Sequence, residues 1–136
     1  MPVERCLDDF KGRWALSKTI THGDGTAARF EGHATWTPVE TGLAYHENGQ
    51  LLLPGAAPIR AERRYLWQEP LRVYFEDGRF FHDVPPNGGE ALHHCAPDLY
   101  RVRYDFGDWP EWQATWHVTG PRKDYLMKMH FSCLYD

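Results

Sequence analysis

The sequence predicts an all-β protein in which antiparallel strands follow one another as an up-and-down meander and close into a lipocalin-like barrel. Apolar and polar residues alternate with a period of two through most of the chain, which is typical of strands with one buried face. Turn signals such as Gly23-Asp24-Gly25, Pro54-Gly55 and Asp77-Gly78 separate these segments, so neighbouring strands are joined by short connections. Closure into a barrel removes exposed sheet edges, and a sandwich is the alternative.

The alternating segments account for a barrel of about 8–10 strands. They cover residues 14–20, 28–36, 43–53, 59–67, 71–75, 79–84, 100–106, 112–119 and 125–133. Residues 7–11 fit a short helical turn before the first strand. Asn48-Gly49 indicates a bulge within a long strand, or alternatively a hairpin turn. The longest loop-like run is 85–90, and we expect a loop over residues 85–98.

Length and composition indicate one globular domain, residues 1–136. Aromatic residues make up 15% of the chain, and large rings efficiently line or fill a small barrel. The net charge of -4 gives no basic footprint, so we expect no nucleic-acid partner. No apolar run reaches the roughly 20 residues of a membrane span, and the N-terminus does not read as a signal peptide. We therefore expect a cytoplasmic protein, and the sequence leaves open whether it forms a homodimer.

The three cysteines, Cys6, Cys95 and Cys133, are odd in number and widely spaced. This pattern argues against a disulfide framework. We expect three thiols packed as small hydrophobic side chains.

The motif Phe10-x-Gly12-x-Trp14 after a short helical turn resembles the opening of the calycin group, which comprises lipocalins and intracellular fatty-acid-binding proteins. The resemblance implies that Trp14 closes one end of the barrel, commonly under a basic residue from a late strand. Arg122 or Lys123, in the turn that starts at Gly120-Pro121, would be that residue, as a cation–π contact. The same turn is a weak candidate for a phosphate cradle.

The whole chain also resembles an uncharacterised family of small, mostly bacterial proteins of unknown function. The matching pieces are Phe10-x-Gly12-x-Trp14, Tyr45-x-Glu47, Arg63-x-Tyr65, Asp77-Gly78-Arg79-x-Phe81-His82, His94-x-x-x-Asp98-x-Tyr100 and Gly120-Pro121-Arg122-Lys123-Asp124-Tyr125. This resemblance implies a lipocalin-like barrel and brings no activity with it. Because a signal peptide and a disulfide pair are not seen, an extracellular transport role is not expected.

Polar residues in phase with the apolar face of a strand should point into the barrel. Lys18, Glu47, Arg63 and Tyr100 meet this rule, and Asp98 joins them if its strand begins before it. Arg63 has two interpretations. It forms a structural ion pair with Glu47, or it anchors the carboxylate or phosphate of a ligand by bidentate hydrogen bonds, as an internal arginine does in fatty-acid-binding proteins.

The favoured function is binding of a small, partly apolar ligand with an acidic group inside the barrel. The apolar part would lie against aromatic side chains and Met127, with the head near Arg63. The candidate ligand-binding residues are Glu47, Arg63, Tyr65, His82, His94, Asp98, Tyr100 and Trp116, with Trp36 also lining the apolar part.

Two other functions remain open at this stage. In the first, the protein is a small enzyme in which His82 acts as a base at the barrel mouth, with Asp98 or Glu47 as its partner. In the second, the barrel holds a metal through His82, His94 and Asp98 with His93 and Cys95, although no complete metal motif is present, or it binds haem as the nitrobindin-like barrels do, by analogy of fold. The pattern leaves the direction of His82 open, because His82 is in phase with Phe80 and Val84 while Phe81 takes the opposite face. The sequence names no cofactor.

Overall fold

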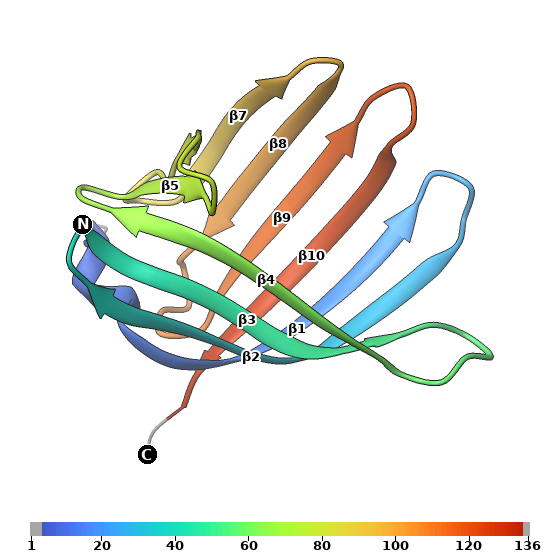
Figure 1. Ribbon diagram of the computed structural model, residues 1–136, viewed down its shortest axis with the longest axis horizontal. Helices are drawn as coiled ribbons and strands as arrows, with labels where there is room; N and C mark the ends of the chain where they lie inside the picture. The colour runs from blue at the N-terminus through green and yellow to red at the C-terminus, as the bar shows by residue number, and fades with distance from the viewer. Residues whose placement is uncertain (1–3, 135–136) are drawn as a thin grey trace.

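The computed structural model describes residues 4–134 and contains a ten-stranded antiparallel sheet after a four-residue 3-10 helix (Figure 1). The elements are η1 (Leu7–Phe10), β1 (Gly12–His22), β2 (Ala27–Val39), β3 (Gly42–Leu52), β4 (Ile59–Gln68), β5 (Arg72–Phe75), β6 (Phe80–Asp83), β7 (Gly89–Cys95), β8 (Asp98–Asp105), β9 (Trp112–Thr119) and β10 (Asp124–Cys133). The all-β class, the meander and the short helical turn are therefore confirmed. The number of strands also lies within the predicted range.

The sheet curls into a nearly closed barrel because β1 pairs with β10 as well as with β2. The two ends of the sheet are β6 and β7, which lie against each other without a ladder of backbone hydrogen bonds in the described chain. Side chains close this seam: the His93 ring of β7 lies 5.2 Å from Phe81 of β6 and 5.9 Å from Phe75 of β5, measured between ring centroids.

The loop expected over residues 85–98 is largely wrong. Only residues 84–88 connect β6 to β7, and β7 forms a hairpin with β8 in which Cys95 pairs with Asp98. The sequence did not predict β7 because the alternation of apolar and polar residues in this strand is inverted. The apolar Leu92 is 54% exposed, whereas the polar His93 is half-buried on the inner face.

Asn48-Gly49 is neither a bulge nor a turn, because β3 keeps an unbroken register with both β2 and β4 through this point. Gly49 lies opposite Gly32 of β2, and the two backbones approach very closely there. A Cβ atom on Gly32 would lie 2.3 Å from the Asn48 carbonyl oxygen. The glycines are thus explained by the close approach of two strongly bent strands.

Aromatic side chains fill the end of the barrel near η1. Phe10, Trp14, Trp36 and Trp112 are buried and in mutual ring contact. The Trp14 indole Nε1 donates a hydrogen bond to the Phe10 carbonyl oxygen at 2.9 Å. Trp14 therefore helps to close this end, as the calycin resemblance implies.

The expected cover of Trp14 by Arg122 or Lys123 is wrong. In the β1–β10 ladder Trp14 pairs with Cys133, whereas Tyr125, next to the turn that carries the two basic residues, pairs with His22 at the other end of β1. The cation at the closed end is instead Arg5, whose guanidinium lies 4.5 Å from the centroid of Trp109.

The cysteines are all free thiols, but they are not all packed in the interior. Cys6 and Cys95 are exposed and Cys133 is partly buried, so the expected burial is wrong for the first two. Cys95 stands at the tip of the β7–β8 hairpin, where no core reaches it.

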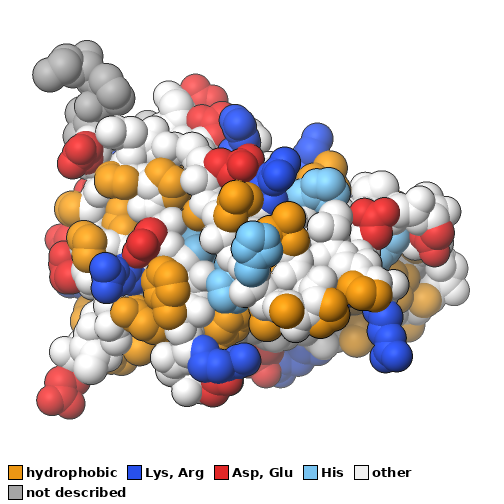
Figure 2. Space-filling view, turned by 90° about the horizontal axis from the view of Figure 1, so that it is seen from above, with side chains coloured by type: hydrophobic (Ala, Val, Ile, Leu, Met, Phe, Trp, Pro, Cys, Tyr) orange, Lys and Arg blue, Asp and Glu red, His pale blue; other side chains and the backbone are white. Residues whose placement is uncertain are grey.

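On the surface, the face seen from above carries acidic, basic, histidine and apolar side chains side by side, without a patch of one charge (Figure 2). Within residues 4–134, no helix has the length and apolar character needed to cross a membrane.

Candidate functional site

The barrel has a hollow of about 500 Å³ at the end opposite η1, which we call the mouth. The β1–β2, β3–β4 and β9–β10 hairpins, which supply part of its lining, point away from η1 (Figure 1). The lining comes from strands all around the barrel, since the wall of a barrel presents every second residue inward. The lining residues are Ile20, His22, Ala28, Leu51, Leu53, Arg63, Tyr65, Phe75, Tyr100, Trp116, Arg122, Lys123, Asp124, Tyr125 and Met127. The volume falls within the ~300–1,000 Å³ typical of small-molecule sites.

The charges at the mouth are mostly positive. Arg63, Arg122 and Lys123 line it, against a single carboxylate, Asp124. Lys123 is already engaged: its Nζ lies 3.0 Å from Asp98 Oδ2 and donates a hydrogen bond to the Tyr100 hydroxyl at 3.3 Å. The hydrogen bond to Asp98, followed by that to Tyr100, raises the pKa of Lys123 above its usual range.

Arg63 and Arg122 are the cations without a carboxylate partner. No ion pair in the described part of the chain involves either guanidinium. Arg63 is exposed at the rim, with Tyr65 as its neighbour two positions along β4 on the same face. Burial lowers the pKa of Arg63, but Tyr65 and Glu47 outweigh that effect and the pKa is raised overall.

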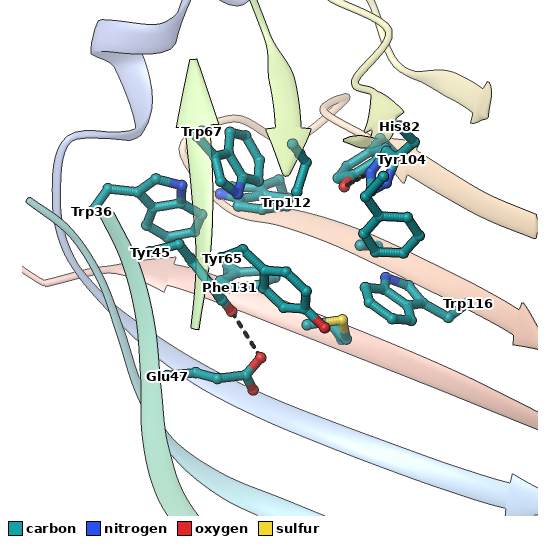
Figure 3. A pocket seen from close by; sticks show the side chains of 14 residues that line it. Trp36, Tyr45, Glu47, Tyr65, Trp67, His82, Tyr104, Trp112, Trp116 and Phe131 are labelled. Atoms are coloured by element: carbon teal, nitrogen blue, oxygen red, sulfur yellow. Dashed lines mark hydrogen bonds between the residues drawn. The ribbon is translucent and has the colours of Figure 1, made fainter. Parts of the chain in front are cut away.

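Deeper in the barrel lies a second, much smaller space of about 30 Å³, which we call the inner cavity (Figure 3). It is lined by Trp36, Tyr45, Glu47, Tyr65, Trp67, Val73, Phe81, His82, Tyr104, Trp112, Ala114, Trp116, Met129 and Phe131. Tyr65 and Trp116 line both the inner cavity and the mouth, so these two side chains separate the two spaces.

Glu47 forms a buried ion pair with Lys18, not with Arg63. The register does place Glu47 opposite Arg63, as two neighbouring strands would, but the Glu47 carboxylate contacts the Lys18 ammonium through Oε2. The Tyr45 hydroxyl donates to Oε1 at 3.2 Å. Lys18 is 5% and Glu47 2% exposed. Burial lowers the pKa of Lys18, with a smaller lowering by Arg63, and the attraction of Glu47 only partly offsets these effects.

The interpretation of Arg63 as the structural partner of Glu47 is therefore wrong. Lys18 reaches the carboxylate from β1, two strands away, because the barrel wall curves around the shared interior. Its Nζ also lies 4.8 Å from the Phe30 ring centroid, a favourable cation–π distance.

His82 points into the barrel and is 2% exposed. Its Nε2 is 2.8 Å from the Tyr104 hydroxyl, and its Nδ1 has no partner. Burial, and secondarily His93, lowers the pKa of His82 from 6.5 to about 3, so the ring is neutral at physiological pH. Burial raises the pKa of Tyr104 far above its usual range.

The predicted site residues fall into three places. Arg63, Tyr65, Tyr100 and Trp116 line the mouth, with Asp98 beside it on Lys123. Glu47 and His82 line the inner cavity. His94 is exposed on the outer face, because its neighbour His93 takes the inward position. Sequence reasoning did not place His93 among the ligand-binding residues, because β7 departs from the usual alternation and turns this polar side chain inward.

The arrangement proposed for acid–base catalysis is not assembled. His82 contacts Tyr104, and Asp98 contacts Lys123, so the proposed base and its carboxylate partner do not meet. In residues 4–134 no three side chains of His, Cys, Asp or Glu are grouped in a way that could hold a metal ion. The inner cavity is also far smaller than the ~300–1,000 Å³ of sites that take small molecules or cofactors, so haem does not fit there in this conformation.

The sequence matches the model of a family described as "Family of unknown function (DUF6314)" over residues 10–133. The chain belongs to this family. Among solved structures, it is similar to the S-type phycobiliprotein lyase from Guillardia theta, with a TM-score of 0.63 and 6% sequence identity, over 96% of this chain and 90% of that one. That likeness establishes the shared fold. A search of curated proteins found no relative. The resemblance to a barrel family of unknown function is thus confirmed.

Proposed function

We propose that the protein binds a small, partly apolar molecule with an acidic group, and that the ligand occupies the mouth of the barrel with its acidic group beside Arg63. The observation that carries this proposal is the combination found in the mouth: a hollow of about 500 Å³, an aromatic lining, and two arginines without a carboxylate partner among residues 4–134. Ligand sites are commonly concave and apolar with a few placed polar groups.

The chemistry of the mouth favours an anion. A guanidinium offers paired N–H donors that match a carboxylate or phosphate, and Arg63, which interacts with Tyr65, has no carboxylate partner among residues 4–134. Arg122 adds a second cation, and Asp124 is the only carboxylate in the lining. Tyr65, Tyr100 and Trp116 offer flat apolar surface below the rim, against which the rest of the ligand would pack.

The likeness in fold supports this proposal in a general way. The similar structure is that of a phycobiliprotein lyase, which shares the barrel fold of this chain. At 6% identity no residue role is carried over. The site itself favours binding over acid–base catalysis, because His82 is buried away from the mouth and Asp98 already neutralises Lys123.

Two measurements test the proposal. Native mass spectrometry of the freshly purified protein should show a co-purified small molecule that is released on denaturation. Separately, calorimetric titration with decanoate should give a dissociation constant that Arg63→Gln weakens about tenfold, since a hydrogen bond to a charged group contributes about 1.5 kcal/mol or more.

The matched control is Arg60→Gln. Arg60 lies on the same strand but on the outer face, so its loss should leave decanoate affinity unchanged. If both variants bind decanoate equally well, Arg63 is not the anchor. If the wild-type protein binds neither decanoate nor a co-purified molecule, the proposed ligand class is wrong.

A further inference from the structure

The inner cavity carries hydrogen-bonding groups that the proposed function does not use. The indole Nε1 atoms of Trp36 and Trp112 and the Nδ1 atom of His82 are buried without a partner, and all three side chains line this one small space. Trp36 is 1% and Trp112 2% exposed. A buried polar group without a partner costs about 1–3 kcal/mol, so three around one cavity point to a group that satisfies them.

The two tryptophans face the same space. Their ring centroids lie 5.9 Å apart, and Figure 3 shows the nitrogen-bearing edges of the two rings turned toward each other. An indole N–H can only donate. The matching partner is therefore a hydrogen-bond acceptor. The Trp14 indole, by contrast, is already satisfied by the Phe10 carbonyl.

The charge of the acceptor follows from Glu47, which also lines the inner cavity. Glu47 forms its ion pair with Lys18, so the positive charge nearby is already matched. A second anion beside this carboxylate would be repelled in a low-dielectric interior. A neutral acceptor, such as a carbonyl or ether oxygen, avoids that repulsion. The volume of about 30 Å³ suits a group of one or two non-hydrogen atoms.

We propose that the inner cavity binds a neutral oxygen acceptor at the deep end of the ligand, held by the indole N–H groups of Trp36 and Trp112. This inference rests on the proposed function, because it assumes that the ligand enters the barrel through the mouth. The mouth and the inner cavity share Tyr65 and Trp116, whose ring centroids lie 6.3 Å apart, so these two rings must move apart for a ligand with its acidic group at Arg63 to reach the cavity. The ligand is thus polar at both ends, with an anionic group outside and a neutral oxygen inside.

The test compares two probes that differ only at the deep end, decanoate and 9-oxodecanoate, by calorimetry. The ketone should bind the wild-type protein about thirtyfold more tightly, because two net hydrogen bonds of about 1 kcal/mol each are gained. Trp36→Phe and Trp112→Phe, which keep an apolar ring, should each reduce this preference for the ketone over decanoate, whatever each does to the affinity for decanoate itself. The matched control is Trp109→Phe, since Trp109 lies at the closed end and lines neither space.

A second readout uses the unmodified protein. Indole N–H signals in a ¹⁵N–¹H spectrum, assigned with the same variants, report directly on the two donors. The ketone should move the Trp36 and Trp112 N–H signals downfield, as a new hydrogen bond does, whereas decanoate offers no acceptor and should not. Equal affinity for both acids with unmoved indole signals would overturn the inference and leave the proposed function standing, with water alone in the cavity.

Failure of the proposed function gives a different pattern. If neither acid binds, titration with methanol decides the inference, because methanol has a neutral oxygen acceptor, only two non-hydrogen atoms and no acidic group. Shifts of the Trp36 and Trp112 signals that saturate would support an acceptor site independent of the mouth. Unmoved signals would overturn it.

Discussion

Replacing Lys18 with methionine should destabilise the protein strongly, because the change leaves the Glu47 carboxylate buried without its cation. Glu47 is 2% exposed and would keep only the hydrogen bond from the Tyr45 hydroxyl. Breaking a buried ion pair by removing one partner costs about 3–5 kcal/mol. That is a large share of the roughly 5–15 kcal/mol by which domains of this kind are stable.

The assay is urea unfolding followed by tryptophan fluorescence. With a slope of about 1–3 kcal/mol per molar urea, the midpoint should fall by roughly 2 M. The control is Lys128→Met, since Lys128 is exposed on β10 and outside every ion pair found in residues 4–134. The double variant Lys18→Met/Glu47→Gln should recover most of the loss, because the buried charge is gone while the Tyr45 hydroxyl keeps an acceptor. A Lys18→Met protein whose free energy of unfolding at pH 8 lies within about 1 kcal/mol of the wild-type value would refute the reasoning.

Two further predictions concern His82 and Gly32. The folded-state pKa of His82 is lowered from 6.5 to about 3, so the unfolded chain takes up the proton first as pH falls. Stability that is present above pH 6.5 is therefore lost as pH falls toward 3, by up to about 1.4 kcal/mol per pH unit. The free energy of unfolding of His82→Gln should lack this pH-dependent component, and parallel pH profiles of the two proteins would contradict the prediction. Gly32→Ala should cost about 1–3 kcal/mol in thermal unfolding, because the new Cβ meets the Asn48 carbonyl at 2.3 Å. Gly107→Ala, where the nearest atom belongs to the Asp105 side chain at 3.1 Å, is its control and should change little.

The sequence was sufficient for the fold because alternation with a period of two survives in nearly every strand. Trp14, Leu16, Lys18 and Ile20 show how this works: the apolar residues identified the inner face of β1, and Lys18 was found by its phase with them. The strand that was missed, β7, reverses the rule by exposing Leu92 and turning His93 inward. Local pattern alone cannot reveal such a reversal, because the cause is the packing of His93 against Phe81 across the seam.

The sequence predicted which site residues lie on the inner face of the barrel, but not how deep in the barrel each one lies. Alternation placed Glu47 and Arg63 on the inner face, and both do face that way. It could not show that Glu47 lies in the buried interior whereas Arg63 lies at the rim, since depth depends on strand tilt and on the curvature of the sheet. The partner of Glu47 was missed for the same reason: Lys18 comes from β1, two strands away, and the curvature of the sheet brings its ammonium to that carboxylate.

The central claim is that the mouth of the barrel receives the ligand. The most direct measurement is the set of intermolecular nuclear Overhauser effects between bound ¹³C-labelled decanoate and the protein. The account predicts contacts from the decanoate chain to the Met127 methyl group and to the rings of Tyr65 and Trp116, which all line the mouth. Contacts confined to exposed residues of the outer face, such as Leu92, would contradict it.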